Sequence, residues 1–478
     1  MKVTAFLWLL LIVGVCTTPG VTPGIQILAA ATPRPPTPAV TPAPGVLLTL
    51  WNERQQRHEI HLVDPATGRD LPGRTLRTIS DNPLYTLPAA ISSDGQRLAV
   101  VGSRGQSCEP FAGGSSCRPS ADELRLVNLP AQRRVKAALP GQGWVGLFAF
   151  NPQSSTLALS YELKKNSTLM LFDTHTGQLI GQRVLEFRPA LVSFALDGTS
   201  LALYGAPLGP NPGIAKPGSP RLLLLEAATL EVQWEQPLER ILSGSWCEEN
   251  CAAPHEERLF AYWSPAVVLS QDGRRLYLVH ADEEKLTTVD LAARVVRSVE
   301  MQAARPWLEE LLALTAGVAQ AKGTGMGGFK TAVLATDGTR LFVLGQAMEA
   351  TPTPEGHWQS STTLLGLQVI EVESGRKVAS LDTQASGIRL TPDGAYLLLE
   401  GWGEQELWAE VLDAATLERI AHLTGWEVVL SRQTDGQPVL LARRSGQTTT
   451  ELAVLDPHSF SVVKSWQVHG HASWIALP

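Results

Sequence analysis

The stretch VVLSQDGRRLYLV, residues 267–279, is the clearest copy of a unit that recurs along the chain. Apolar residues alternate with their neighbours on both sides of Asp272-Gly273, a pattern typical of two short strands joined by a tight turn. Glycine adopts the positive φ of such a turn at little steric cost. The stretch therefore predicts a β-hairpin.

Two turn signatures alternate from Gly45 onward. The first is this hairpin, present in seven copies at Asp94-Gly95, Asn151-Pro152 (a degenerate copy), Asp197-Gly198, Asp272-Gly273, Asp337-Gly338, Asp393-Gly394 and Asp435-Gly436. The second is a strand that ends in an acidic or amide residue, followed by a short turn and another strand. Its eight copies centre on Asp64, Asn128, Asp173, Glu226, Asp290, Glu371, Asp413 and Asp456. Each repeat therefore contains four strands.

Four-stranded units that recur every roughly 40–60 residues predict an all-β fold, the β-propeller, in which each unit is one blade. We name the strands of a blade A to D from the centre outward, so that the first signature joins A to B and the second joins C to D. Residues 45–52 begin the first blade at strand B, whereas residues 472–478 have the pattern of an A strand without a following hairpin. We expect these ends to pair and close a ring of eight four-stranded blades. A ring of seven blades with one unpaired end is the alternative.

The repeats also resemble a known family. LSQDGRRLYLV (269–279) and LTPDGAYLLLE (390–400) are similar to the repeats of bacterial YVTN-type and related tryptophan–aspartate-repeat propellers. The resemblance covers roughly residues 45–478 and implies the propeller fold. Since many functions share such repeats, it implies nothing about a ligand.

The N-terminus has the composition of an export signal. Lys2 precedes an apolar run from Ala5 to Val15, which has the length of a signal-peptide core and is too short to span a bilayer. We expect a signal peptide or leader at 1–31, a Pro/Thr-rich linker at 32–45 and the propeller at 46–478. Surface anchoring through a lipid-modified Cys16 is the alternative to release. Either way the sequence predicts a secreted or cell-surface protein without a membrane span.

The cysteines other than Cys16 form two close pairs, Cys108 with Cys117 and Cys247 with Cys251. In an oxidising compartment each pair most simply forms a local disulfide. A shared metal site is the alternative, although no histidine lies at zinc-finger spacing. The formal net charge of −7 gives no support to nucleic-acid binding. We expect a monomer that needs no cofactor.

The long segments of the chain all join strand B to C or strand D to the next A. They are residues 104–122, 206–219, 239–263, 302–329 and 346–362. In a propeller these connections share one face, and loops on a rigid scaffold are where binding sites concentrate. This face is the predicted working surface. A face that merely tolerates insertions is the alternative.

Candidate binding residues lie in these segments. Trp246 and Trp358 fall within them, the second beside His357, and exposed aromatic side chains suit sugars or peptides. Residues 305–321 have apolar side chains near helical spacing, which predicts one inserted helix near 306–320 that packs Trp307 against the propeller. A partner-binding helix is the alternative.

Motifs of catalysis are largely missing. GTGMGG at 323–328 has the letters of a dinucleotide-binding loop in the reverse structural context, so we interpret it as a flexible loop. No G-x-S-x-G nucleophile motif occurs, and the carboxylates of Asp382 and Glu427 are isolated candidates. We assign no catalytic or metal-binding residue.

The sequence therefore favours an exported, non-catalytic propeller that presents a loop-rich face to a protein, a glycan or a small ligand. A propeller enzyme with a site at the central channel, such as a lactonase-like hydrolase or a quinoprotein, is the alternative. A surface-anchored spacer is a third hypothesis.

Overall fold

A computed structural model of the chain describes residues 45–474 with gaps at 53–56, 72–75, 78–88, 103–105, 112–113, 142, 164–165, 208–214, 253–257, 303–324, 354–357, 404–405, 434–436, 447 and 471. All regular elements among these residues are β-strands, so the all-β prediction is confirmed. Within this part of the chain there is no helix with the length and apolar character needed to cross a bilayer. The predicted leader at 1–31, the linker up to residue 44 and the helix near 306–320 lie outside the described residues.

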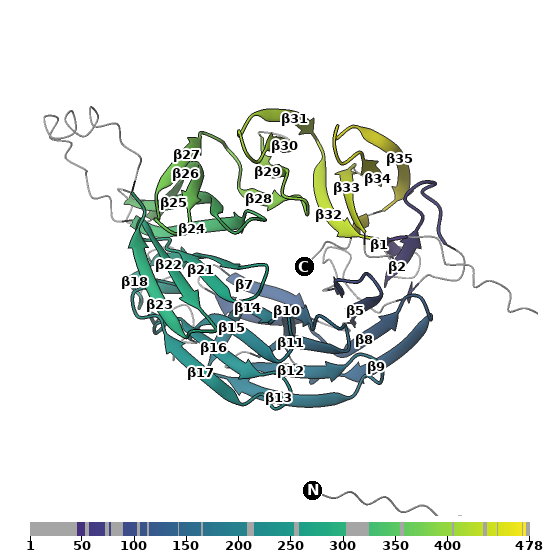
Figure 1. Cartoon of the computed structure of the whole chain (residues 1–478), viewed down its shortest axis with the longest axis horizontal. Coiled ribbons are helices and arrows are strands. Elements are labelled where there is room, and N and C mark those ends of the chain that lie inside the picture. The colour runs from purple at the N-terminus through teal and green to yellow at the C-terminus, as the bar shows by residue number, and fades with distance from the viewer. Residues whose placement is uncertain are drawn as a thin grey trace, which may run out of the picture. The chain divides into compact units, whose positions relative to one another are not determined.

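Eight sheets follow one another around a ring (Figure 1). Seven of these sheets have four strands, and the sheet of blade 6 has six. With strands A to D in order, blade 1 consists of β36 (Ala472–Trp474), β1 (Val46–Asn52), β2 (Arg57–Val63) and β3 (Leu76–Arg77); blade 2 of β4 (Ala89–Ile91), β5 (Arg97–Gly102), β8 (Glu123–Asn128) and β9 (Arg133–Ala138); and blade 3 of β10 (Trp144–Phe150), β11 (Thr156–Glu162), β12 (Ser167–Asp173) and β13 (Leu179–Leu185). Blade 4 consists of β14 (Phe187–Phe194), β15 (Ser200–Pro207), β16 (Arg221–Glu226) and β17 (Val232–Pro237); blade 5 of β20 (Ala266–Leu269), β21 (Arg275–Val279), β22 (Lys285–Asp290) and β23 (Val295–Glu300); and blade 6 of β24 (Gly325–Leu334), β25 (Arg340–Pro352), β26 (Trp358–Glu371) and β27 (Lys377–Leu381). Blade 7 consists of β28 (Gly387–Leu390), β29 (Tyr396–Trp402), β30 (Leu407–Asp413) and β31 (Arg419–Thr424), and blade 8 of β32 (Glu427–Arg432), β33 (Pro438–Ser445), β34 (Thr449–Leu455) and β35 (Val462–His469).

The ends of the ring meet in blade 1. β36 pairs antiparallel with β1, so that Trp474 lies opposite Leu48 and Ala472 lies opposite Leu50. Trp474 is buried, and its indole Nε1 donates a hydrogen bond of 3.0 Å to the carbonyl oxygen of Ala442 in blade 8. The predicted eight blades and the completion of the first blade by the C-terminal strand are confirmed. The alternative of seven blades is wrong.

Neighbouring blades share hydrophobic cores. Leu47 of blade 1 belongs to one cluster with Leu98 of blade 2, and Leu48 of blade 1 belongs to another with Leu441 of blade 8. Among the described residues eight such clusters fill the eight interfaces. A single blade exposes two apolar faces, so stacking in a closed ring buries both.

The A–B turns are stabilised by a local network around an aspartate. In blade 5 the Oδ1 atom of Asp272 accepts hydrogen bonds from Ser270 Oγ at 2.5 Å and from the Arg274 N–H at 3.0 Å. Gly273 has a φ of 67°, and the other described Asp-Gly turns also place their glycine at positive φ. The turn beside Asp435-Gly436 lies outside the described residues.

The C–D turns follow one geometric rule. The residue four positions after the acidic or amide residue has a positive φ in all eight turns. These residues are Gly68, Gln132, Gly177, Leu230, Arg294, Gly375, Leu417 and Phe460. In six of the turns this residue also donates its N–H to the carbonyl oxygen four positions earlier, as Phe460 does to Asp456 at 2.9 Å. Only three of the eight are glycines, so five turns accept the strain of a left-handed L-residue.

The alternating strand directions separate two faces of the ring. A–B and C–D turns lie at one end of the antiparallel strands, which we call the turn face, and B–C and D–A connections lie at the other end, the loop face. All five long segments join B to C or D to A, so they gather on the loop face as the sequence predicts.

Candidate functional site

Three of the long segments build one extension of blade 6, which we call the accessory sheet. β18 (Gly244–Glu249) and β19 (Leu259–Ser264) form a hairpin, and β19 runs parallel to the beginning of β24, with Tyr262 opposite Gly327. The far parts of β25 and β26 continue the sheet, with Ala350 opposite Ser360. The described parts of the segments 239–263, 302–329 and 346–362 therefore belong to one sheet.

Glycines at the beginning of β24 allow this pairing. A Cβ atom on Gly327 would lie 2.2 Å from the carbonyl oxygen of Tyr262, and one on Gly328 would lie 2.6 Å from that of Ala281. No other residue type fits such contacts. Gly325 to Gly328 belong to a strand, so the interpretation of GTGMGG as a flexible loop is wrong for these residues.

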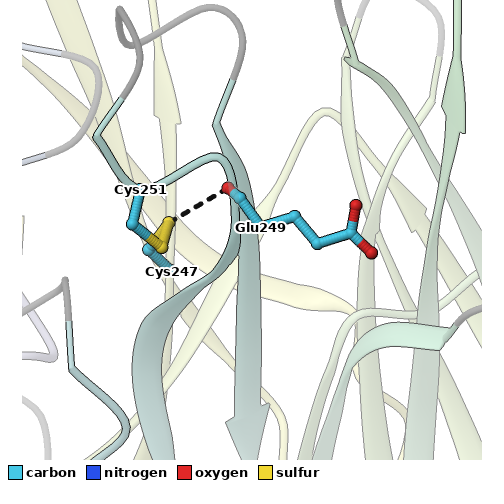
Figure 2. The surroundings of a disulfide bond; sticks show 3 residues. All are labelled: Cys247, Glu249 and Cys251. Atoms are coloured by element: carbon cyan, nitrogen blue, oxygen red, sulfur yellow. Dashed lines mark hydrogen bonds between the residues drawn. A yellow bond between two sulfur atoms is a disulfide. The ribbon is translucent and has the colours of Figure 1, made fainter.

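One of the two predicted disulfides is present. Cys247 and Cys251 are bonded at the end of β18, and Cys247 Sγ lies 3.2 Å from the carbonyl oxygen of Glu249 (Figure 2). Cys108 and Cys117 lie directly opposite each other in the hairpin of β6 (Gln106–Phe111) and β7 (Gly114–Pro119). That register suits a bridge between the two strands, and the second disulfide stays a prediction.

The aromatic residues singled out in the sequence do not form a site together. Trp246 is only 2% exposed, and Lys216 Nζ lies 5.1 Å from its ring centroid. The expectation that this side chain faces solvent is therefore wrong, because its ring packs inside the structure. Trp358 is half-buried at the start of β26, opposite Pro352. Trp246 and Trp358 thus lie on strands at opposite edges of the accessory sheet. Trp307 and His357 lie outside the described residues.

A different group of aromatic residues lines a cavity on the loop face. The cavity measures about 300 Å³ and lies where the A strands of blades 7 and 8 begin. We call it the tryptophan pocket. Its lining consists of Ser386, Gly387, Glu400, Gly401, Trp402, Leu407, Trp408, Trp426 and Glu427.

The backbone of blade 7 positions two of the three indoles. Gly401 lies opposite Trp408 in the register of β29 and β30, and a Cβ atom on Gly401 would come within 2.3 Å of Trp408 Cζ2. The missing side chain therefore lets the indole of Trp408 lie across the neighbouring strand. Trp402, the next residue, is 72% exposed at the end of β29.

The other aromatic walls are held by neighbouring side chains. Trp408 stacks on His422, with ring centroids 6.2 Å apart and an interplanar angle of 23°. Trp426 is 9% exposed, and the guanidinium of Arg444 lies 4.7 Å from its ring centroid. Two of the three indoles thus have defined ring partners, whereas Trp402 is largely exposed at the rim.

Two carboxylates contribute the charges of the pocket. Arg389 Nη1 donates to Glu400 Oε1 at 3.1 Å and also to the carbonyl oxygen of Val428. Burial raises the pKa of Glu400, a shift that Arg389 opposes and Glu427 reinforces. The ionised form of Glu400 is therefore incompletely compensated by its surroundings.

The second carboxylate connects the pocket to the closure of the ring. Arg443 Nε donates to Glu427 Oε2 at 2.7 Å, and Arg443 Nη1 donates to the carbonyl oxygen of Ala472 in β36 at 3.1 Å. Glu427 is an isolated candidate in the sequence, whereas in the structure it lies beside Glu400, which comes from the preceding blade.

A polar cluster on the loop face of blades 5 and 6 is more deeply buried. His280 is 1% exposed, its Nε2 lies 2.8 Å from Thr287 Oγ1, and burial lowers its pKa to about 4. Lys330 is 5% exposed, and its Nζ lies 3.6 Å from Glu284 Oε1. Burial raises the pKa of Asp282. Within the described ranges no three His, Cys, Asp or Glu side chains are arranged to hold a metal ion.

Sequence reasoning missed the tryptophan pocket although a signal was available. The pair Gly-Trp occurs at 143–144, 401–402 and 425–426, each time at a connection on the loop face, and the last two pairs lie in neighbouring repeats. The strand assignment already placed both pairs on the same face. Their convergence depends on two blades packing side by side, which no single repeat shows.

Comparison with solved structures supports the fold. The chain is similar to a structure described as dihydro-heme d1 dehydrogenase NirN in complex with DHE, at 14% identity over 94% of this chain and 78% of that chain, with a TM-score of 0.52. It is also similar to a structure of the eukaryotic initiation factor (11% identity, 91% of this chain and 99% of that chain, TM-score 0.45) and to Kuenenia stuttgartiensis hydrazine synthase (14% identity, 79% and 96%, TM-score 0.42). No family model and no curated protein matches the chain. The first likeness shows a β-propeller and nothing narrower, so the YVTN-type assignment stays a prediction.

Proposed function

We propose that the protein is an exported, non-catalytic β-propeller that binds a small organic ligand, or the end group of a larger one, in the tryptophan pocket. The observation that carries this proposal is the exposure of Trp402. Its side chain is 72% exposed at the rim of a cavity whose other two indoles are held in place. A large exposed aromatic beside a concave polar site is typical of a surface that a ligand covers.

The position of the pocket supports a role in binding. It lies on the loop face, where the accessory sheet and the described parts of the other long segments also lie, whereas the described A–B and C–D connections of the turn face are short. Rigid scaffolds concentrate recognition at such variable ends. The apolar run from Ala5 to Val15 and the Cys247–Cys251 disulfide support export.

The ion pairs of the pocket favour binding over acid–base catalysis. Glu400 is held by Arg389 and Glu427 by Arg443. Arg389 opposes the rise in the pKa of Glu400 that burial causes, and a general base must be free to bind and release its proton in each cycle. Product formation from a bound molecule would favour the alternative of a propeller enzyme.

A ligand-observed NMR screen tests the proposal. The wild-type chain and the Trp402→Ala variant are screened against a fragment library that contains sugars, amines and short peptides. We expect fragments whose saturation-transfer signal disappears in Trp402→Ala. Val463→Ala, which removes another side chain with 65% exposure, should leave those signals unchanged. Equal binding of every fragment to all three proteins would overturn the proposal.

A further inference from the structure

We propose that the tryptophan pocket binds an alkylated ammonium group, such as a trimethylammonium head. This inference rests on the proposed function, because it specifies the chemistry of the ligand in the same pocket. The group could belong to a free small molecule or to a lipid head group.

The charges of the pocket favour a cation. The described residues that line it include the carboxylates of Glu400 and Glu427 and no cationic side chain. Arg389 and Arg443 contact these carboxylates and also donate to the carbonyl oxygens of Val428 and Ala472, which fixes them at the base of the network. The two carboxylates therefore belong to the lining of the pocket, and the guanidiniums of Arg389 and Arg443 that pair with them do not.

The burial of Glu400 points in the same direction. Its side chain is 17% exposed and its pKa is raised, mainly by burial, although Arg389 is bound to it. A carboxylate whose ionised form is disfavoured by burial gains from any further positive charge nearby. A cation in the pocket would supply that charge.

The indole rings favour an alkylated cation over a bare ammonium. Trp402, Trp408 and Trp426 line the pocket, and the ring of Trp426 already attracts one cation, the guanidinium of Arg444. Indole faces carry negative quadrupole charge, and quaternary ammonium groups are typical ligands of aromatic cages. An alkylated ammonium loses little hydration on burial and also contacts the rings through its methyl groups. A bare ammonium would require hydrogen-bond acceptors on all sides.

A neutral sugar fits the lining less well. Sugar hydroxyl groups need both donors and acceptors. The described lining offers two carboxylates that only accept, whereas its side-chain donors are the hydroxyl of Ser386 and indole N–H groups. The chemistry of the pocket is complementary to positive charge.

Titration calorimetry with a matched pair of ligands tests the inference. Choline carries the trimethylammonium group, and 3,3-dimethyl-1-butanol has the same shape without the charge. We expect choline to bind at least about tenfold more tightly than its neutral analogue. Trp402→Ala and Glu400→Gln should each weaken choline binding by about fivefold to tenfold.

Two further variants distinguish a loss of choline binding from a loss of folding. Gly387→Val should abolish binding because its side chain fills part of the cavity. The fold should tolerate the change, since a Cβ atom at Gly387 makes only ordinary contacts with Glu400, the nearest at 3.6 Å. Glu418→Gln, at an exposed carboxylate on the turn face, should bind like wild type. Equal affinity for choline and its neutral analogue, or unchanged choline binding in Trp402→Ala and Gly387→Val, would overturn the inference.

Vesicles identify the source of the group. Retention on phosphatidylcholine vesicles and not on phosphatidylglycerol vesicles would indicate a lipid head group, and choline binding without retention would indicate a free molecule. If choline fails while other fragments bind in a Trp402-dependent manner, only this inference falls. If no fragment depends on Trp402, the proposed function falls with it.

Discussion

The two faces of the ring place some of their charged groups in different environments. On the turn face the pKa of Asp272 is lowered by a hydrogen bond from Ser270, and that of Asp413 is lowered by the backbone N–H of Thr416. On the loop face burial raises the pKa of Glu400 and lowers that of His280. Turn-face carboxylates such as Asp272 thus serve local structure as acceptors, whereas the loop face also contains buried groups, Glu400 and His280, whose charged forms are disfavoured. Incomplete compensation of this kind is a feature of functional sites.

The two faces also differ in the sequence separation of the residues that form their side-chain networks. A turn-face network joins residues a few positions apart, as Asp272 does with Ser270 and Arg274. The pocket on the loop face depends on Trp402 and Trp426, which come from successive blades. Mutations on the turn face should therefore change stability, and mutations of exposed residues on the loop face should change binding.

The largest expected effect concerns two tryptophans in opposite environments. Trp474 is 5% exposed in the closing strand and packs edge-on against Trp466, with ring centroids 5.8 Å apart. Trp474→Ala should lower the free energy of unfolding by about 3–5 kcal/mol. Trp402→Ala, at 72% exposure, should change it by less than about 0.5 kcal/mol. Denaturant titrations of both variants measure the difference, and equal losses would contradict the separation of roles.

A smaller loss is expected at a C–D turn where a left-handed residue is also buried. Phe460 is 1% exposed, has a φ of 55°, and contacts Tyr396 of blade 7 with ring centroids 5.0 Å apart. Phe460→Gly relieves the backbone strain but loses the aromatic packing, so we expect a net loss of about 3 kcal/mol by chemical denaturation. Phe460→Leu should lose less than half of that, since Leu230 and Leu417 occupy the same turn position. A gain in stability for Phe460→Gly would show that strain outweighs packing.

The buried polar cluster of the loop face predicts a pH dependence. The pKa of His280 is about 4 in the folded chain, mainly because of burial, with Glu283, Lys285 and Lys330 as its charged neighbours. In the unfolded chain the imidazole of His280 has the ordinary histidine pKa of about 6.5, so the unfolded chain binds the proton first as the pH falls. His280 therefore reduces stability as the pH drops from about 6.5 to 4, by at most about 3 kcal/mol.

A non-titrating variant isolates this effect. In His280→Gln the free energy of unfolding should fall less steeply over the same pH range, so that the gap to wild type narrows toward pH 4. Asp282, whose raised pKa acts in the opposite sense, is present in both proteins and cancels in the comparison. Parallel stability curves for the two proteins would exclude His280 as the titrating group.

The turns of the turn face could be predicted from the sequence because the residues that form each turn lie within a single repeat. Asp272-Gly273 specifies a turn locally, and the unmatched strands at residues 45–52 and 472–478 predicted the closure. The Gly-Trp pairs at 401–402 and 425–426 are visible in the sequence, but their convergence across two blades is not. Trp246 was expected to be exposed, yet it is buried because β18 joins the accessory sheet.

The accessory sheet shows the same limit. The parallel pairing of Tyr262 with Gly327 joins segments that are far apart in the chain. The glycines at 327 and 328 were visible in the sequence, but their reason, the close approach of Tyr262 and Ala281, is a tertiary contact. Glu400 could not be recognised from the sequence for a similar reason. Glu400, Arg389 and Glu427 come from three different strands and meet only in the folded chain.

The smallest predicted effect has the opposite sign. Arg294 occupies the same turn position as Phe460, with a φ of 58°, but its side chain is exposed. Arg294→Gly therefore removes the strain of the left-handed conformation without losing packing. Because glycine also adds freedom to the unfolded chain, we expect a net gain of only about 0.5–1 kcal/mol. The reciprocal change, Gly177→Ala at a φ of 73°, should destabilise by about 1 kcal/mol. Shifts of the same sign for these two variants would mean that side-chain contacts, and not φ, control the stability of this turn.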